Sequence, residues 1–132
     1  MIEKLEKLDK IHSFKRLLEQ VSGSKRSLNI AGLIGSSRAL LASWLYLKTG
    51  RIVLFITPDT ESSEKANDDF IAYLGEDMVS LYPSWEVQPY EIRAPHAENV
   101  GDRLKTLYDL LRDRKMVICA PAQAILEPTI ER

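Results

Sequence analysis

Short apolar runs alternate with longer helical patterns along this chain, and this alternation constrains its fold more than any other feature. Most of the runs contain β-branched residues, as strands buried on both faces do. The runs cover Leu28–Ala31, Ile52–Thr57, Met78–Tyr82 and Met116–Ala120, and the helical patterns cover Arg38–Lys48, Glu61–Leu74 and Glu98–Arg112. Strands that alternate with helices predict an α/β fold in which helices flank a parallel sheet.

The residues before the first run carry a separate pattern. Apolar side chains recur every three or four positions between Ile2 and Val21, which predicts an N-terminal amphipathic helix over residues 1–21. Packing on its own domain is the expected use of this helix, although a helix that binds a partner would show the same pattern. Residues 22–27 predict a linker, so residues 28–132 form the α/β domain. We expect a fragment of a much longer protein, because a new helical pattern begins shortly before the sequence ends.

Charge and composition argue against several classes of function. The net charge is −1 with a pI near 6.1, which gives no electrostatic reason to expect a nucleic-acid partner. No apolar stretch approaches the ~20 residues that span a bilayer, and the charged N-terminus does not look like a signal peptide. The single cysteine, Cys119, lies in an apolar run and suits a reducing compartment. We therefore predict a cytoplasmic protein with no membrane contact.

A glycine-containing turn between the first run and the first helical pattern matches part of a phosphate-binding loop. Relative to G-x-x-x-x-G-K-[ST], the sequence keeps the first glycine. Ser37 replaces the second glycine, Arg38 the lysine, and Ala39 the hydroxyl that binds Mg²⁺. This pattern predicts a degenerate P-loop NTPase-like, helicase-like domain, although a plain strand-to-helix turn explains it about as well. The candidate loop residues are Gly32, Gly35, Ser36, Ser37, Arg38 and Ala39.

These replacements remove the chemistry of nucleotide hydrolysis. Arg38 keeps a positive charge, but its planar guanidinium does not substitute for a compact ammonium. Ala39 has no oxygen for Mg²⁺, and no acidic cluster follows an apolar run. Ser36 or Ser37 can still cap the following helix. We expect no catalytic residue, no bound cofactor and no metal site in this chain, whose two histidines lack a metal-binding spacing.

An unusually long connection links the third run to the last helical pattern. Residues 82–97 include three prolines together with Trp85, Tyr90 and His96. Connections of this length inside compact domains are uncommon and often functional. Two interpretations of this connection are possible: a direct role in binding, or a proline-stiffened crossover whose aromatic side chains pack on the sheet. We favour the crossover.

The same region carries a dense motif. It reads Trp85-Glu86-Val87-Gln88-Pro89-Tyr90, then Ala94-Pro95-His96, then Asp102-Arg103-Leu104-Lys105-Thr106-Leu107-Tyr108. This order resembles the W-E-x-x-P-Y…S-P-H…R-L-x-T-L-Y signature of the N-terminal region of bacterial transcription-repair coupling factors, with alanine in place of the usual serine. The resemblance extends from about Leu28 to Leu126. Its signature residues are Trp85, Pro89, Tyr90, Pro95, His96, Arg103, Leu104 and Tyr108.

The resemblance implies a non-catalytic scaffold or interaction domain that supports recruitment of the nucleotide-excision-repair machinery to stalled RNA polymerase. In the longer protein, the N-terminal module would recruit the damage-recognition protein of excinuclease ABC, while other domains bind RNA polymerase and DNA. ATP and Mg²⁺ would belong to a separate DNA-translocase motor. The chain is also similar to the first domain of the helicase-like ATPase of excinuclease ABC, but the span from Tyr90 to Glu98 is too short for that protein's DNA-probing hairpin.

Two other classes of function remain open. The glycines and the helix N-terminus favour an unconventional nucleotide-binding enzyme in which Arg38 replaces the usual lysine. The missing Mg²⁺ ligand and the missing acidic cluster argue against it. A DNA-binding module follows only from the family context. The near-zero net charge argues against it, because neutralisation of phosphates supplies much of the affinity for DNA.

Overall fold

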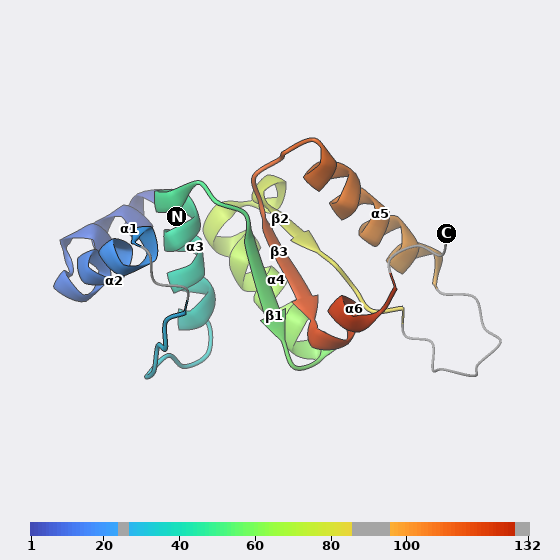
Figure 1. Cartoon of the computed structure of the whole chain (residues 1–132), viewed down its shortest axis with the longest axis horizontal. Helices are drawn as coiled ribbons and strands as arrows, with labels where there is room; N and C mark the ends of the chain where they lie inside the picture. Colours follow the sequence, from blue (N-terminus) through green and yellow to red (C-terminus); the bar gives the residue numbers. More distant parts are fainter. Residues whose placement is uncertain (24–26, 86–95, 129–132) are drawn as a thin grey trace.

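A three-stranded parallel sheet forms the centre of the computed structural model, which describes residues 1–23, 27–85 and 96–128 (Figure 1). The strands lie in the order β1-β3-β2, with Val117 of the central strand opposite Val53 on one side and Val79 on the other. The predicted α/β fold with a parallel sheet flanked by helices is confirmed. The strands are β1 (Val53–Thr57), β2 (Val79–Leu81) and β3 (Val117–Pro121).

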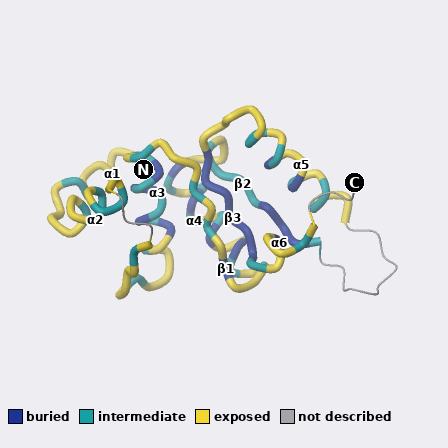
Figure 2. The backbone as a smooth tube through the Cα atoms, in the orientation of Figure 1, coloured by how far each residue is buried: buried dark blue, intermediate teal, exposed yellow. Residues whose placement is uncertain are grey.

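The central strand is buried along its whole length (Figure 2). Side chains alternate between the two faces of a strand, so Val117 and Cys119 join the core on one face, and Ile118 and Ala120 join the core on the other. Burial raises the pKa of the Cys119 thiol to about 12, which keeps the thiol neutral and unreactive near neutral pH.

Helices of the α/β region lie close to the predicted positions. The helix after the loop begins one residue before Arg38, and the helix predicted from Glu61 ends at Leu74 as predicted. The helical segments are α3 (Ser37–Thr49), α4 (Thr60–Leu74), the 3-10 helix η2 (Glu76–Met78), α5 (Ala97–Leu111) and α6 (Ala122–Leu126).

The two faces of the sheet are covered by different helices. α4 packs across one face, where the fully buried ring of Phe70 meets Phe55 edge-on at 5.1 Å between ring centroids. α5 and α6 contribute to the core on the other face, around Tyr82 and Ile118. A sequence with two such apolar faces on its central strand requires helices on both sides.

The N-terminal residues form two short helices and a 3-10 turn rather than the single predicted helix. The chain leaves the helical conformation at Ile11, where ψ is 123°. A straight helix of 20 residues would be about 30 Å long, whereas the 13 residues of α3 span about 20 Å. Because the N-terminal segment bends at Ile11, the residues before and after the bend can both contact α3. The segments are α1 (Ile2–Glu6), η1 (Lys7–Lys10) and α2 (His12–Ser22).

This N-terminal segment docks on its own domain through α3. Leu5 is buried, and Asp9 accepts a hydrogen bond from the Trp44 indole at 2.8 Å. Asp9 also pairs with Lys48, and these two contacts lower the pKa of the Asp9 carboxyl. The ring of Phe14 meets Trp44 edge-on at 4.9 Å. Within the described ranges, no helix is both long and apolar enough to span a bilayer.

The predicted first strand, Leu28–Ala31, is wrong. Residues 27–34 form no regular secondary structure, and Ile30 is 45% exposed. A strand is stabilised by pairing with a neighbour, and no described strand pairs with the outer edge of β1 or with residues 28–31. Apolar composition alone therefore does not place this run in the sheet. The strand-turn-helix setting of a P-loop fold is not confirmed.

Candidate functional site

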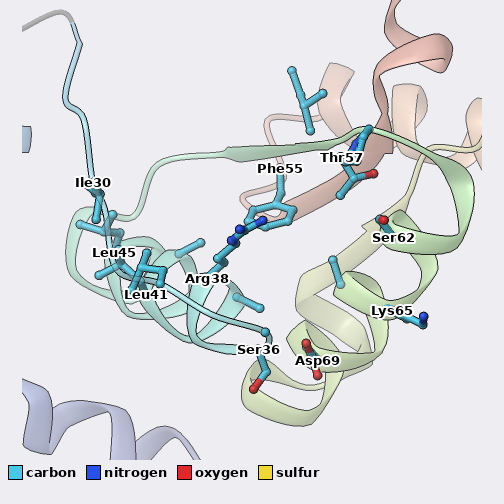
Figure 3. Close-up of a pocket in the computed structure, with 17 residues that line it drawn as sticks. Ile30, Ser36, Arg38, Leu41, Leu45, Phe55, Thr57, Ser62, Lys65 and Asp69 are labelled. Carbon is cyan, nitrogen blue, oxygen red and sulfur yellow. The ribbon is translucent and has the colours of Figure 1, made fainter.

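A groove of about 670 Å³ lies where the degenerate loop, α3, β1 and α4 meet (Figure 3). Aliphatic and aromatic side chains make up most of its wall. Ile30 and Leu33 contribute from the irregular segment, Leu41 and Leu45 from α3, and Phe55 from β1. The groove therefore suits an occupant that is largely apolar.

The loop beside this groove is held by its own serine. Gly32 and Gly35 have positive φ angles of 84° and 55°, which favour glycine over residues with side chains. The Ser37 hydroxyl accepts a hydrogen bond from the Ile34 amide at 2.8 Å and donates one to the Ile34 carbonyl at 2.7 Å. Because Ser37 is used within the turn and Ser36 makes no side-chain capping bond, the predicted cap on α3 is not formed.

The charged groups of the groove are few. Figure 3 shows the Arg38 side chain projecting from α3 into the space between α3, β1 and α4, and it makes no hydrogen bond or ion pair with another described residue. Lys65 is paired with Glu61 at 2.6 Å. Ala39, where a phosphate loop carries its Mg²⁺-binding hydroxyl, is only 2% exposed. Asp69 adds a carboxylate from α4 that makes no ion pair with another described residue. Among the described residues, the groove thus presents one unpaired guanidinium and one unpaired carboxylate in a largely apolar wall.

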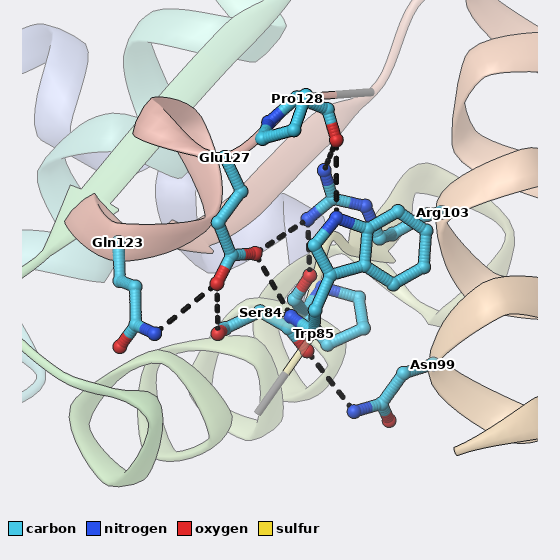
Figure 4. Close-up of polar contacts among 8 residues, drawn as sticks. Ser84, Trp85, Asn99, Arg103, Gln123, Glu127 and Pro128 are labelled. Atoms are coloured by element: carbon cyan, nitrogen blue, oxygen red, sulfur yellow. Dashed lines mark hydrogen bonds and ion pairs between the residues drawn. The ribbon is translucent and has the colours of Figure 1, made fainter. Parts of the chain in front are cut away.

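A second polar cluster surrounds Arg103, which is 1% exposed (Figure 4). Its guanidinium lies between the rings of Tyr82 and Trp85, at 4.2 and 4.1 Å from the two centroids. It donates hydrogen bonds to the Pro83 carbonyl at 2.9 Å and to Glu127 Oε2 at 3.2 Å. Two aromatic faces, a carbonyl and a carboxylate replace part of the water that this charge loses on burial, while its buried Nε makes no hydrogen bond with a described residue.

Glu127 connects this cluster to the end of α6. Besides Arg103, its carboxylate accepts hydrogen bonds from the Ser84 hydroxyl and the Trp85 amide, both at 2.8 Å, and from the Gln123 amide at 3.1 Å. Segments that follow β2 and α6, with 43 positions between Ser84 and Glu127, are thereby tied together. Sequence reasoning missed Glu127 and Ser84, and no spacing in the chain points to either.

The structure brings together only some of the signature residues. Trp85 and Arg103 are in contact, and His96 occupies the N-cap position of α5 without a side-chain capping bond. Leu104 and Tyr108 are 50% and 57% exposed on a different side of α5, where the Tyr108 hydroxyl accepts a hydrogen bond from Arg112. The other signature positions, Pro89, Tyr90 and Pro95, lie outside the described residues.

Comparisons with known proteins point to one group of relatives. No protein-family model matches the chain. The sequence is 26% identical to the transcription-repair-coupling factor of Haemophilus influenzae over 98 residues, which are 74% of this chain and 8% of that protein. The factors of Escherichia coli and Staphylococcus haemolyticus are also 26% identical, over 86% and 89% of this chain and 10% of each relative. The chain spans about a tenth of the length of these curated relatives, and the similarity fits an N-terminal fragment of such a factor.

Proposed function

We propose that this chain is a non-catalytic scaffold domain of a transcription-repair coupling factor. Its role is to support recruitment of the nucleotide-excision-repair machinery to stalled RNA polymerase in the cytoplasm. The observation that carries the proposal is the similarity to these factors across about three quarters or more of the chain. The altered phosphate loop, whose Ala39 offers no ligand for Mg²⁺, supports the non-catalytic part.

In this proposal the domain uses no cofactor of its own. ATP and Mg²⁺ act in a separate motor of the longer protein. The damage-recognition protein of excinuclease ABC is the partner of the N-terminal module, and other domains bind RNA polymerase and DNA. The net charge of −1 agrees with a domain that contacts protein rather than nucleic acid, because a DNA-binding surface needs an excess of cations.

A reconstituted repair reaction tests this role. The full-length protein is compared with a version that lacks residues 1–132, on a template that carries a lesion and a stalled RNA polymerase. We expect the truncated protein still to hydrolyse ATP and displace the polymerase, but no longer to stimulate excision on the transcribed strand. If the truncated protein no longer hydrolysed ATP, catalysis would depend on this domain, and the proposal would be overturned.

A second candidate, nucleotide binding through Arg38, is favoured by the unpaired guanidinium in the groove. Titration of the chain with ATP and Mg²⁺ tests it, beside an Arg38→Gln variant and a Ser37→Gly/Arg38→Lys variant. Binding by the natural sequence that Arg38→Gln abolishes would establish a nucleotide site. Binding by the double variant alone would indicate a loop that kept its shape and lost its chemistry.

A further inference from the structure

The outer edge of β1 has no partner strand among the described residues. The Val53 amide donates to the Met116 carbonyl at 3.1 Å, so Val53 directs its backbone groups toward β3. Because this direction alternates along a strand of a parallel ladder, Phe55 and Thr57 also face β3, whereas Leu54 and Ile56 direct their amides and carbonyls toward the open edge. This edge can therefore accept another strand.

Two side chains of β1 are exposed beside this edge, although Val53, Phe55 and Thr57 pack toward the core. Leu54 is 49% exposed and Ile56 is 53% exposed, although Ile118, which pairs with Leu54 in the ladder, is only 4% exposed. β1 contains no charged residue or proline, the usual devices that keep an edge strand from pairing. A strand with this composition is expected to be covered on its free side.

The groove described above adjoins the same edge. Phe55, Ile56 and Thr57 form part of its wall on the β1 side, and Ile30 and Leu33 face it from the irregular segment. Arg38 and Asp69 supply opposite charges that are not paired with each other within this largely apolar setting. A guanidinium against an apolar surface is stabilised by a carboxylate, which it binds through parallel hydrogen bonds.

We infer that the groove and the outer edge of β1 bind an extended, apolar segment of the same longer polypeptide, which pairs with β1 as a strand and places a carboxylate against Arg38. The inference rests on the proposed function, because it requires the longer protein. The curated relatives supply the reason for this source, since the chain accounts for only 8–10% of their length. A segment of the same chain also has a high effective concentration at the site.

Hydrogen exchange resolved to single amides tests the pairing. The full-length protein and the isolated 132-residue chain are compared under the same conditions. We expect the Leu54 and Ile56 amides to exchange at least about tenfold more slowly in the full-length protein, with a smaller change at Val53 and Phe55, which already face β3. Equal exchange of Leu54 and Ile56 in both proteins would overturn the inference.

The charge of the occupant is tested in the full-length protein with Arg38→Glu. This variant should reverse most of the added protection at Leu54 and Ile56, whereas Arg38→Lys should retain more of it. Arg51→Glu is the matched control, because Arg51 is exposed and does not line the groove. If Arg38→Glu and Arg51→Glu changed the protection of Leu54 and Ile56 equally, the inference that the bound segment places a carboxylate against Arg38 would be wrong.

Other occupants give different results, and each would overturn the assignment. Protection in the isolated chain that grows with its concentration would identify a second copy. Protection of the full-length protein only after addition of the excinuclease damage-recognition protein would identify that partner.

If the full-length protein stimulates excision but Leu54 and Ile56 exchange equally in both forms, only this inference fails. Protection without any effect on repair would instead overturn the proposed function and leave the pairing in place.

Discussion

Arg103 and Arg38 both project from long helices, yet their surroundings are opposite. Arg103 is 1% exposed and is enclosed by two rings, a backbone carbonyl and Glu127, all from this chain. Arg38 is exposed beside a largely apolar groove and has no described partner. The comparison teaches that a guanidinium on a long helix is buried where other segments of the same chain supply its partners, and stays exposed where they do not.

The sharpest way to break this comparison is the same substitution at both arginines. Arg103→Met should lower the free energy of unfolding by about 3–5 kcal/mol, because it leaves Glu127 without its counter-ion and removes the cation between two rings. Arg38→Met should change it by less than about 0.5 kcal/mol. Urea unfolding of both variants measures the difference, and equal losses would contradict the comparison.

A hydroxyl introduced at the base of the loop tests how closely the groove wall is packed. Ala39→Thr should destabilise the chain by about 1–3 kcal/mol, because Ala39 is 2% exposed and the larger side chain must enter the core with its hydroxyl. Ala39→Ser, which adds less volume, is the matched control and should cost less. Thermal unfolding of the two variants measures the difference. If Ala39→Thr did not lower the unfolding temperature, the groove wall would not be closely packed at this position.

The aromatic rings that stack on a buried and on an exposed arginine can be compared directly. Trp85→Leu should cost about 1–2 kcal/mol, since the ring covers Arg103 and its indole donates to the Pro128 carbonyl at 3.0 Å. Tyr108→Leu should cost less than about 0.5 kcal/mol, because Tyr108 is 57% exposed and stacks on the exposed Arg112. Chemical denaturation of both variants checks the order, and a reversed order would show that Trp85 is peripheral.

The smallest effect is expected where the N-terminal segment meets α3. The pKa of Asp9 is lowered by Lys48 and Trp44, so the stability gained from the ionised carboxylate is present above its ordinary value of about 3.9 and is lost as the pH falls through the lowered pKa. The difference in stability between the natural chain and Asp9→Asn should therefore narrow below about pH 4. Lys48→Met should weaken this pH dependence, and no change would show that the contact contributes nothing.

Much of the sheet and its helices could be predicted from local pattern. The runs at residues 52–57 and 116–120 differ from β1 and β3 by one residue at their ends, and the helix from Glu61 to Leu74 begins one residue early in the structure. These segments were predictable because continuous apolar runs and amphipathic periodicity reflect burial on both faces or on one. The run Leu28–Ala31 is similarly apolar but has no described neighbour to pair with, so its pattern predicted a strand that did not form.

The candidate site was predictable only in part. The loss of the lysine and the hydroxyl from the loop could be read directly at Arg38 and Ala39, because they concern residue types. The groove could not, since it arises where α3, β1 and α4 meet. The exposure of Leu104 and Tyr108 could not be predicted from the sequence either, because α5 directs Arg103 and Thr106 toward the core instead.

The sequence by itself determined the α/β class, the parallel sheet and the absence of a Mg²⁺-binding hydroxyl in the loop, since each depends on residue types and their local spacing. Only the tertiary structure decided which arginine is enclosed, that Glu127 is its counter-ion, and that β1 has an open edge among the described residues. The physical reason is that burial and pairing are set by residues distant in sequence, such as Glu127, which lies 24 positions from Arg103. The local sequence pattern around a residue therefore does not indicate which distant residue will contact it.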